Sequence, residues 1–317
     1  MSNKVTIIGA GSVGSTVAYT LAVQGTVSEI VIIDINEEKA LGEAMDIRQG
    51  TPFCYPVNIY AGNYEDAKGS DIVILTSGVG RKPGQTRLDL VNTNVKIAKN
   101  IIPQIAAAAP DAIYVIVGNP VDIITYQFCK YSGLPEHHII GSGTTLDTAR
   151  LRSYLAEYYN INEANVHAYV YGEHGDSSFV PWSLANISNV NVDQYQACLK
   201  DDKPDQPPLD HEYVEQHVRK SGGQIIARKG VTNYAIAIST CHIVKNILNG
   251  AETAMTVSSM MHGEYGIEDV CLSTLSIIGR DGVCGKVLTP LTEEETARLQ
   301  HSAQCLKDVI DQVDFSM

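Results

Sequence analysis

The stretch Lys4-Val-Thr-Ile-Ile-Gly9-Ala-Gly11-Ser-Val-Gly14 decides the fold of the first half of the chain. Its apolar run ends in three glycines spaced as G-x-G-x-x-G, typical of a strand, a tight turn and a helix start. In this pattern Gly9 permits the turn, Gly11 lets a pyrophosphate approach the backbone, and Gly14 lets the helix pack on the strand. The helix N-terminus then faces the anion, so the stretch predicts a bound dinucleotide. The alternative is a plain strand-to-helix corner.

A second apolar run, Glu29-Ile-Val-Ile-Ile-Asp34, follows an expected helix at 15–24. Its closing acid lies about twenty positions after Gly14, the spacing of the ribose-binding acid in dinucleotide-binding units. Asp34 can accept hydrogen bonds from a ribose diol. No arginine follows directly to meet a 2′-phosphate, which favours NAD over NADP. The alternative for Asp34 is an ordinary turn residue at the surface.

Short strand-like runs recur along the first half of the chain and alternate with stretches of helical period. The runs are Val5 to Gly9, Ile30 to Asp34, Val57 to Ala61, Ile72 to Thr76, Ile113 to Val117 and His138 to Gly141. Helical periods cover 88–109 and 122–132. This alternation predicts an α/β fold with a Rossmann-type, doubly wound parallel sheet. Ligands of such sheets bind beyond the carboxyl ends of the strands.

Beyond about Asn162 the pattern changes to strands, turns and long helices. Helices are expected at 212–229, with a break at Gly222-Gly223, and at 232–249, and apolar runs at 254–261 and 270–278 lead to a hairpin turn at 281–282. A last helix begins near Thr292, where Glu295 completes a capping box. We therefore expect two domains: a dinucleotide-binding Rossmann domain at 1–145 and a mixed α+β substrate domain at 146–317.

The composition is that of a globular protein: 44% of the 317 residues are hydrophobic and 19% are charged. A net charge of -13 disfavours nucleic acid and anionic membranes as partners. The seven cysteines form no Cys-x-x-Cys pattern, which favours reduced thiols over a disulfide framework or a metal site. The apolar runs are too short for a membrane span, and the first strand begins where a signal peptide would stand, so we expect a cytoplasmic protein.

The segment Gly172-Glu173-His174-Gly175-Asp176-Ser177 is a glycine-rich loop that presents a histidine. Histidine exchanges protons near neutral pH and serves as a general acid or base. Because the chain has nine histidines, a structural role is the alternative for His174 taken alone.

Asp147 and Arg150 are three residues apart in a stretch that we expect to be helical, so they share one face. A buried Asp147 could accept the ring N–H of His174 and raise its pKa, while Arg150 grips a substrate carboxylate. The alternative is a simple ion pair within the helix.

Along nearly its whole length the sequence resembles the NAD-dependent L-lactate and malate dehydrogenase superfamily. Five motifs carry the resemblance: Gly9 to Gly14 with Asp34, Arg81-Lys-Pro-Gly-Gln-Thr-Arg87, Val117-Gly-Asn119-Pro-Val-Asp122, Leu146-Asp147-Thr-Ala-Arg150, and Gly172-Glu-His174-Gly-Asp. The resemblance implies hydride transfer between NAD and a small 2-oxo or 2-hydroxy acid. A protein that keeps the fold but only binds the dinucleotide is the alternative, although the acid, the base and the arginines are all present.

The resemblance also implies a role for each site residue. His174 exchanges the proton, Asp147 orients it, Arg150 holds the 1-carboxylate, and Arg87, on a loop that closes over the site, polarises the carbonyl. Substrate contacts are implied for Arg81, Asn119 and Thr232. Cofactor contacts are implied for Gly9, Gly11, Val13, Gly14, Asp34, Lys39, Tyr64, Gly78, Val79, Val117, Asn119 and Ser142.

The choice between pyruvate and oxaloacetate rests on conflicting features. Malate enzymes of the superfamily carry arginine at the position of Arg81, where lactate enzymes usually carry glutamine, and an arginine could pair with a second substrate carboxylate. Glu173, Thr232 and the segment 43–46 resemble the lactate branch instead. We favour L-lactate dehydrogenase, with malate dehydrogenase as the alternative.

Arg152 and His167 match the positions at which bacterial lactate dehydrogenases bind fructose 1,6-bisphosphate between subunits. A cationic pair of this kind suits a phosphate group. The resemblance therefore implies allosteric activation by the bisphosphate and a homotetramer. The alternative is a surface arginine and an unrelated strand histidine.

Overall fold

The computed structural model describes residues 3–80, 84, 86–200 and 207–315 of the chain. Within these residues a nine-stranded sheet has the order β12-β11-β10-β6-β5-β4-β1-β2-β3. Its parallel part consists of β1 (Lys4–Ile8), β2 (Glu29–Ile33), β3 (Asn58–Ala61), β4 (Ile72–Leu75), β5 (Ile113–Ile116) and β6 (Ile139–Gly141). This is the predicted doubly wound parallel sheet, with strand bounds within one residue of those expected.

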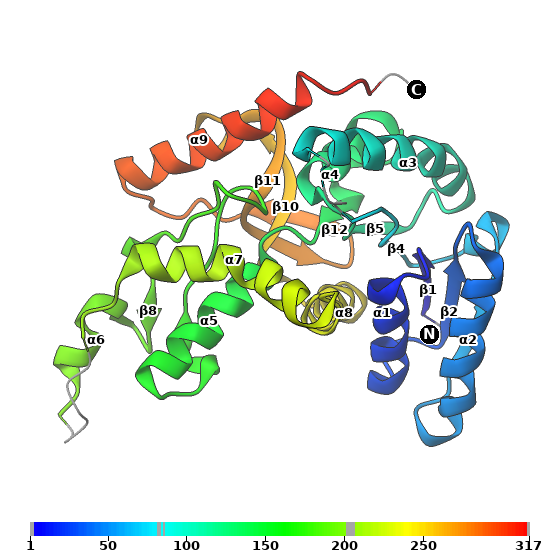
Figure 1. Ribbon diagram of the computed structural model, residues 1–317, viewed down its shortest axis with the longest axis horizontal. Helices are drawn as coiled ribbons and strands as arrows, with labels where there is room; N and C mark the ends of the chain where they lie inside the picture. Colours follow the sequence, from blue (N-terminus) through cyan, green and yellow to red (C-terminus); the bar gives the residue numbers. More distant parts are fainter. Residues whose placement is uncertain (1–2, 81–83, 85, 201–206, 316–317) are drawn as a thin grey trace.

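Helices cover both faces of the parallel strands (Figure 1). The α-helices that follow β1, β2, β4 and β5 are α1 (Ser12–Gln24), α2 (Glu37–Gly50), α3 (Arg87–Ala108) and α4 (Val121–Tyr131), in that order. Since side chains alternate along a strand, Ile72 and Ile74 of β4 pack in one core with α1 and α2, whereas Val73 and Leu75 pack in the other with α3 and α4. The near-continuous apolar strands reflect burial on both faces.

The second half of the chain extends the same sheet. Its long strands β10 (Thr253–His262), β11 (Glu268–Gly279) and β12 (Gly282–Lys286) are antiparallel, and β10 joins β6 through the pair Ser258 and Gly141. Gly282 has a φ of 87°, as a tight hairpin requires. The sheet thus crosses the predicted boundary at 145–146, and the placement of that boundary remains a prediction.

The remaining elements are α5 (Thr145–Tyr159), α6 (Val192–Cys198), α7 (His211–Lys229), α8 (Tyr234–Asn249), α9 (Glu293–Ile310) and a small sheet of β7 (Val166–His167), β8 (Asn186–Ile187) and β9 (Val190–Asn191). Side chains of α5, α6, α7 and the small sheet form a third core. Helix α8 packs in the core that contains α1 and α2, and α9 packs in the core that contains α3 and α4. Helix α9 begins with the predicted capping box of Thr292 and Glu295. The mixed α+β character of this half is confirmed.

The predicted break in the helix at Gly222-Gly223 is wrong, because α7 runs unbroken through both glycines. A Cβ at Gly222 would lie 3.4 Å from Nη2 of Arg150, whereas one at Gly223 would meet no atom within 4 Å. Gly222 therefore leaves room for the Arg150 guanidinium rather than ending the helix.

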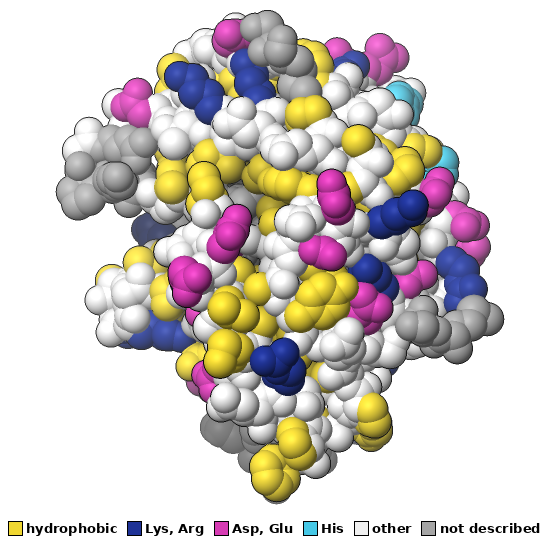
Figure 2. Space-filling view, turned by 90° about the vertical axis from the view of Figure 1, so that its right-hand side faces the viewer, with side chains coloured by type: hydrophobic (Ala, Val, Ile, Leu, Met, Phe, Trp, Pro, Cys, Tyr) yellow, Lys and Arg dark blue, Asp and Glu magenta, His cyan; other side chains and the backbone are white. Residues whose placement is uncertain are grey.

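Apolar side chains are exposed on α1 and α2, the two helices at the lower right in Figure 1. Tyr19, Val23, Leu41 and Met45 are each at least 40% exposed. Figure 2 shows hydrophobic side chains spread among charged ones over this side of the molecule. All seven cysteines are free thiols. Among the described residues, no helix has both the length and the apolar character to cross a bilayer.

Candidate active site

The glycine turn after β1 has the geometry that the sequence predicts. Gly9 has a φ of 111°, and a Cβ on Gly14 would lie only 1.9 Å from the carbonyl oxygen of Gly9. A Cβ on Gly11 would instead point into open space, with no atom within 4 Å. No side chain caps the N-terminus of α1, so its first N–H groups remain available to an anion. The turn therefore fits a dinucleotide pyrophosphate.

Two single substitutions separate packing from binding at this turn. Gly14→Ala is expected to destabilise the fold by about 1–3 kcal/mol or more, because its methyl group has no space. Gly11→Ala is expected to leave the melting temperature almost unchanged but to weaken NADH binding about ten- to a hundredfold, since phosphate hydrogen bonds are lost. Thermal melts and NADH fluorescence titrations measure both effects. Undiminished NADH affinity in Gly11→Ala would argue against a pyrophosphate at this turn.

Asp34 follows β2 and is tied to the glycine turn. Its Oδ2 accepts the N–H of Ala10 at 2.6 Å, and its Oδ1 accepts the N–H of Asn36 at 2.9 Å. Each carboxylate oxygen keeps a further lone pair that can accept a ribose hydroxyl. The turn and the acid are thus locked together, as a preformed dinucleotide site requires.

Asn94 on α3 holds the loops after β4 and β5, although the sequence analysis assigned it no role. Its side chain exchanges hydrogen bonds with the backbone of Val79 (2.8 and 3.1 Å) and donates to the carbonyl of Asn119 at 2.7 Å. Asn94 is only 3% exposed. The signal that could have revealed this role is a polar Asn94 on the face of α3 whose other inward residues are apolar.

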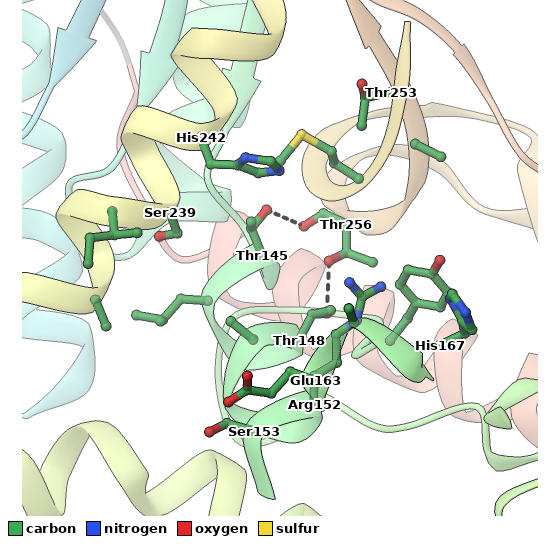
Figure 3. Close-up of a pocket in the computed structure, with 18 residues that line it drawn as sticks. Thr145, Thr148, Arg152, Ser153, Glu163, His167, Ser239, His242, Thr253 and Thr256 are labelled. Carbon is green, nitrogen blue, oxygen red and sulfur yellow. Dashed lines mark hydrogen bonds between the residues drawn. The ribbon is translucent and has the colours of Figure 1, made fainter. Parts of the chain in front are cut away.

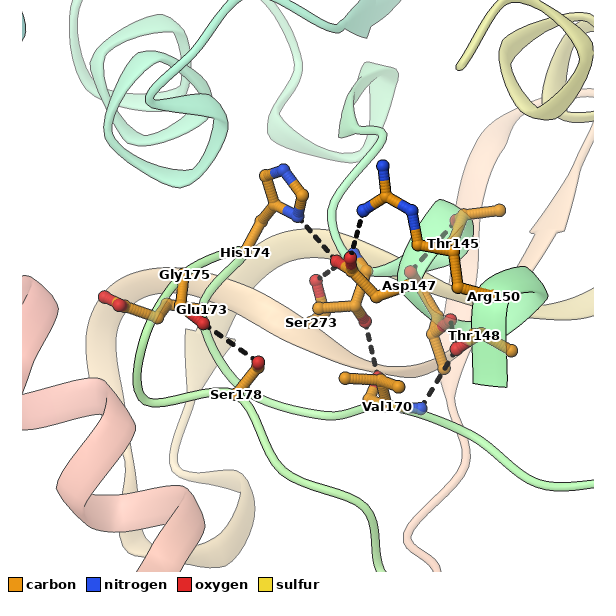
Figure 4. A network of polar contacts seen from close by, with 12 residues as sticks. Thr145, Asp147, Thr148, Arg150, Val170, Glu173, His174, Gly175, Ser178 and Ser273 are labelled. Atoms are coloured by element: carbon orange, nitrogen blue, oxygen red, sulfur yellow. Dashed lines mark hydrogen bonds and ion pairs between the residues drawn. The ribbon is translucent and has the colours of Figure 1, made fainter. Parts of the chain in front are cut away.

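Asp147 lies between His174 and Arg150 (Figure 4). Its Oδ2 is 2.6 Å from Nδ1 of His174, and its Oδ1 accepts a hydrogen bond from Nη1 of Arg150 at 2.9 Å. The Asp147 side chain is 7% exposed, against 28% for His174 and 14% for Arg150. The structure therefore brings His174 to the pair of Asp147 and Arg150, which the sequence grouped by helical spacing.

The electrostatics of this cluster favour a charged His174. The negative charge of Asp147 is the largest influence and, against the opposing effect of burial, raises the pKa of His174 to about 9. Burial alone would raise the pKa of Asp147, but His174 and Arg150 hold it below its usual value. With Nδ1 facing Asp147, Nε2 of the imidazolium is the nitrogen that can give a proton to a substrate.

Asp122 at the start of α4 also belongs to the site, although its sequence motif predicted no role for it. Its Oδ2 accepts the backbone N–H of His174 at 2.8 Å. Burial raises the pKa of Asp122 to about 6. Asp122 thus fixes the loop on which His174 stands.

The other predicted cofactor residues follow the carboxyl ends of the parallel strands or lie on the neighbouring helices. Gly78 and Val79 follow β4, Val117 and Asn119 follow β5, and Ser142 follows β6. Val13 lies on α1 and Lys39 on α2, whereas Tyr64 precedes β4. Gly78, Val79 and Asn119 are exposed at the rim, while Val117 and Ser142 are buried. Their contacts with a dinucleotide remain predictions.

The structure describes the predicted substrate residues Arg81, Arg87 and Thr232 only in part. Arg81 lies outside the described residues. Arg87 is the first residue of α3 and directly follows the N-cap residue Thr86, and its side chain lies outside the described part of the structure. Thr232 is partly exposed in the connection between α7 and α8.

A separate cavity of about 720 Å³ holds the predicted effector residues, with Arg152 and His167 both in its lining (Figure 3). Arg152 Nε donates to the carbonyl of Ala168 at 3.1 Å, and its guanidinium lies 4.8 Å from the ring centre of Tyr169. His242 from α8 lines the same cavity. The lining therefore combines the cationic Arg152, two histidines and the acidic Glu163 with apolar walls.

Comparison with known proteins gives a consistent result. Residues 3–141 match the family model "lactate/malate dehydrogenase, NAD binding domain", and residues 144–315 match its "alpha/beta C-terminal domain". An L-lactate dehydrogenase of Thermoanaerobacterium saccharolyticum is 45% identical over 318 residues, covering 99% of this chain and 100% of the relative. One of Clostridium perfringens is 46% identical over 308 residues, covering 96% of each chain.

Comparison with solved structures gives the same family. A minor L-lactate dehydrogenase from Enterococcus mundtii, in a ligand-bound form, superposes with a TM-score of 0.93 at 39% identity and covers 99% of both chains. The L-lactate dehydrogenase from Clostridium thermocellum gives a TM-score of 0.86 at 40% identity, covering 98% of this chain and 99% of that one. This chain therefore belongs to the lactate/malate dehydrogenase family of NAD-dependent oxidoreductases.

Proposed function

We propose that the protein is an L-lactate dehydrogenase that interconverts pyruvate and L-lactate with NAD as cofactor. The observation that carries the proposal is the cluster in which Asp147 pairs with both His174 and Arg150. The similarity to curated L-lactate dehydrogenases over the full chain supports pyruvate as the substrate. We also propose domains at 1–145 and 146–317 for cofactor and substrate.

The chemistry follows from this geometry. When bound, reduced NAD supplies the hydride for the carbonyl carbon of the substrate. His174, held by Asp147 through Nδ1, gives the proton on Nε2 to the carbonyl oxygen, and neutral His174 takes it back in the reverse direction. Arg150 uses one N–H on Asp147, so its other donors can hold the substrate carboxylate bidentately.

Other residues complete the proposed site. Arg87 polarises the carbonyl, and Arg81, Asn119 and Thr232 line the substrate pocket. The dinucleotide is held by Gly9, Gly11, Val13, Gly14, Asp34, Lys39, Tyr64, Gly78, Val79, Val117, Asn119 and Ser142.

Substrate choice is tested by comparing kcat/KM for pyruvate and oxaloacetate. We expect pyruvate to be preferred by at least about tenfold, because the second carboxylate of oxaloacetate must lose its hydration in the pocket. A preference for oxaloacetate would make the protein a malate dehydrogenase. Arg81→Gln then identifies the cause, since it should lower activity on oxaloacetate much more than activity on pyruvate.

We further propose that fructose 1,6-bisphosphate activates the enzyme at Arg152 and His167. The cavity that both residues line supports this second function, because its volume of about 720 Å³ suits a small phosphorylated ligand. A homotetramer in which the ligand lies between subunits is part of the proposal, and the apolar side chains exposed on α1 and α2 support self-association.

The effector proposal predicts that the bisphosphate lowers the pyruvate KM by about five- to a hundredfold. Pyruvate saturation curves with and without fructose 1,6-bisphosphate measure this effect. Arg152→Gln should remove the response, whereas Arg228→Gln, an arginine in the last turn of α7, should retain it. Superimposable curves for the parent protein would exclude activation.

A further inference from the structure

Cys129 of α4 and Cys271 of β11 have neighbouring sulfur atoms. Sγ of Cys271 is 3.9 Å from Sγ of Cys129 and is placed to donate its S–H to it. Cys271 is fully buried, whereas Cys129 is partly exposed. A disulfide has a sulfur–sulfur distance of about 2.05 Å, so joining the pair requires an approach of about 2 Å. Rotation of two unbranched side chains can supply much of that approach.

A lysine stands beside this pair. Nζ of Lys286 lies 2.8 Å from Sδ of Met261 and 3.5 Å from the carbonyl of Ser259. Burial lowers the pKa of Lys286, while both thiols and Glu264 act against that change. Burial and the neighbouring Cys129 thiol raise the pKa of Cys271, and the positive charge of Lys286 only partly opposes this rise. Cys271 therefore favours its thiol form, and the partly exposed Cys129 is the sulfur that an oxidant reaches first.

The pair lies between the two elements that hold the His174 loop. On α4, Cys129 is seven residues after Asp122 and therefore on the same helix face. Asp122 in turn binds the backbone N–H of His174.

On β11, Cys271 lies two residues before Ser273 and therefore on the same side of the sheet. Ser273 exchanges both backbone hydrogen bonds with Gly172 (2.9 and 3.0 Å), and its Oγ accepts the N–H of Thr144. A covalent link between Cys129 and Cys271 would thus join both supports of the catalytic loop.

We propose that Cys129 and Cys271 form a redox-active pair that a hydroperoxide converts into an intramolecular disulfide, and that this disulfide lowers turnover by drawing α4 toward β11. The effect on turnover rests on the proposed dehydrogenase function. The formation of the disulfide does not.

The reaction balances with hydrogen peroxide as oxidant. The thiolate of Cys129, the more accessible of the two, attacks one peroxide oxygen, the O–O bond breaks, and the released hydroxide takes up a proton as water. The sulfur of Cys271 then displaces a second water from the Cys129 sulfenic acid, as the S–O bond breaks and the S–S bond forms. The two thiols lose two electrons and two protons, and the peroxide becomes two molecules of water.

The test exposes the purified protein to hydrogen peroxide, blocks the remaining thiols with iodoacetamide and maps peptides without reduction. We expect a crosslink between Cys129 and Cys271 and a fall in kcat of about tenfold or more, because small displacements of a catalytic group are costly. Dithiothreitol should reverse both changes. Cys129→Ser and Cys271→Ala should each remove the crosslink and the peroxide response while keeping the basal activity.

Cys241→Ala is the matched control, because this buried thiol on α8 contacts the carbonyl of Val17 instead of another sulfur. It should retain the full response. Absence of the crosslink would overturn the proposal, and a crosslink that leaves kcat unchanged would overturn its coupling to turnover. The peptide map requires no turnover, so it remains decisive if the proposed function fails. If Cys271→Ala does not fold, Cys129→Ser at the more exposed position provides the same test.

Discussion

Replacing His174 by alanine is expected to lower kcat for pyruvate reduction by about 10²–10⁴-fold while NADH still binds. The variant loses the group that exchanges the proton, whereas the glycine turn and Asp34 are separate from it in the structure. Stopped-flow turnover and NADH fluorescence titration measure the two effects separately.

His262→Ala is the control for this substitution, because His262 has an exposed side chain and contacts Glu136 at the surface. It should leave turnover unchanged. Full activity in His174→Ala would remove His174 from the proposed role.

His174→Ala is also expected to change the stability of the folded state. The raised pKa of His174 means that its pairing with Asp147 stabilises the folded state fully below about pH 6.5 and loses this effect as the pH rises through about 9. His174→Ala should therefore destabilise the protein more at pH 6 than at pH 10, as urea unfolding at both values would show.

Replacing Asp147 by asparagine is expected to move the pH dependence of the reaction. In the parent protein kcat/KM for pyruvate should fall as the pH rises through about 9, where the imidazolium loses its proton. Because the charge of Asp147 is the main cause of the raised pKa, the fall in the variant should begin near or below about pH 6.5. At pH 7.5 the loss of protonated histidine alone then lowers the rate about tenfold.

Asp193→Asn offers a matched control, because Asp193 also pairs with a histidine, His211, but at an exposed position. Its pH profile should equal that of the parent. An unchanged profile in Asp147→Asn would mean that Asp147 does not set the protonation of His174.

Much of the site could be predicted from short stretches of sequence, because those parts depend on local geometry. Gly9 needs a positive φ, and Gly14 has no space for a Cβ, and both constraints arise within one short turn. Asp147 and Arg150 share a helix face because they are three residues apart. Asp122 and Asn94 were missed because their roles depend on the backbone of His174 and of Asn119, which are distant in sequence.

The sequence by itself determined the doubly wound parallel sheet, since the pattern of neighbouring residues specifies each buried strand and each helix start. Only the tertiary structure decided that β10 joins β6, that Asp147 lies between His174 and Arg150, and that Cys129 meets Cys271. These pairings join segments far apart along the chain, and no local periodicity encodes which distant partner a side chain meets. Their physical basis is the packing of helices on both faces of one sheet, which brings those segments into contact.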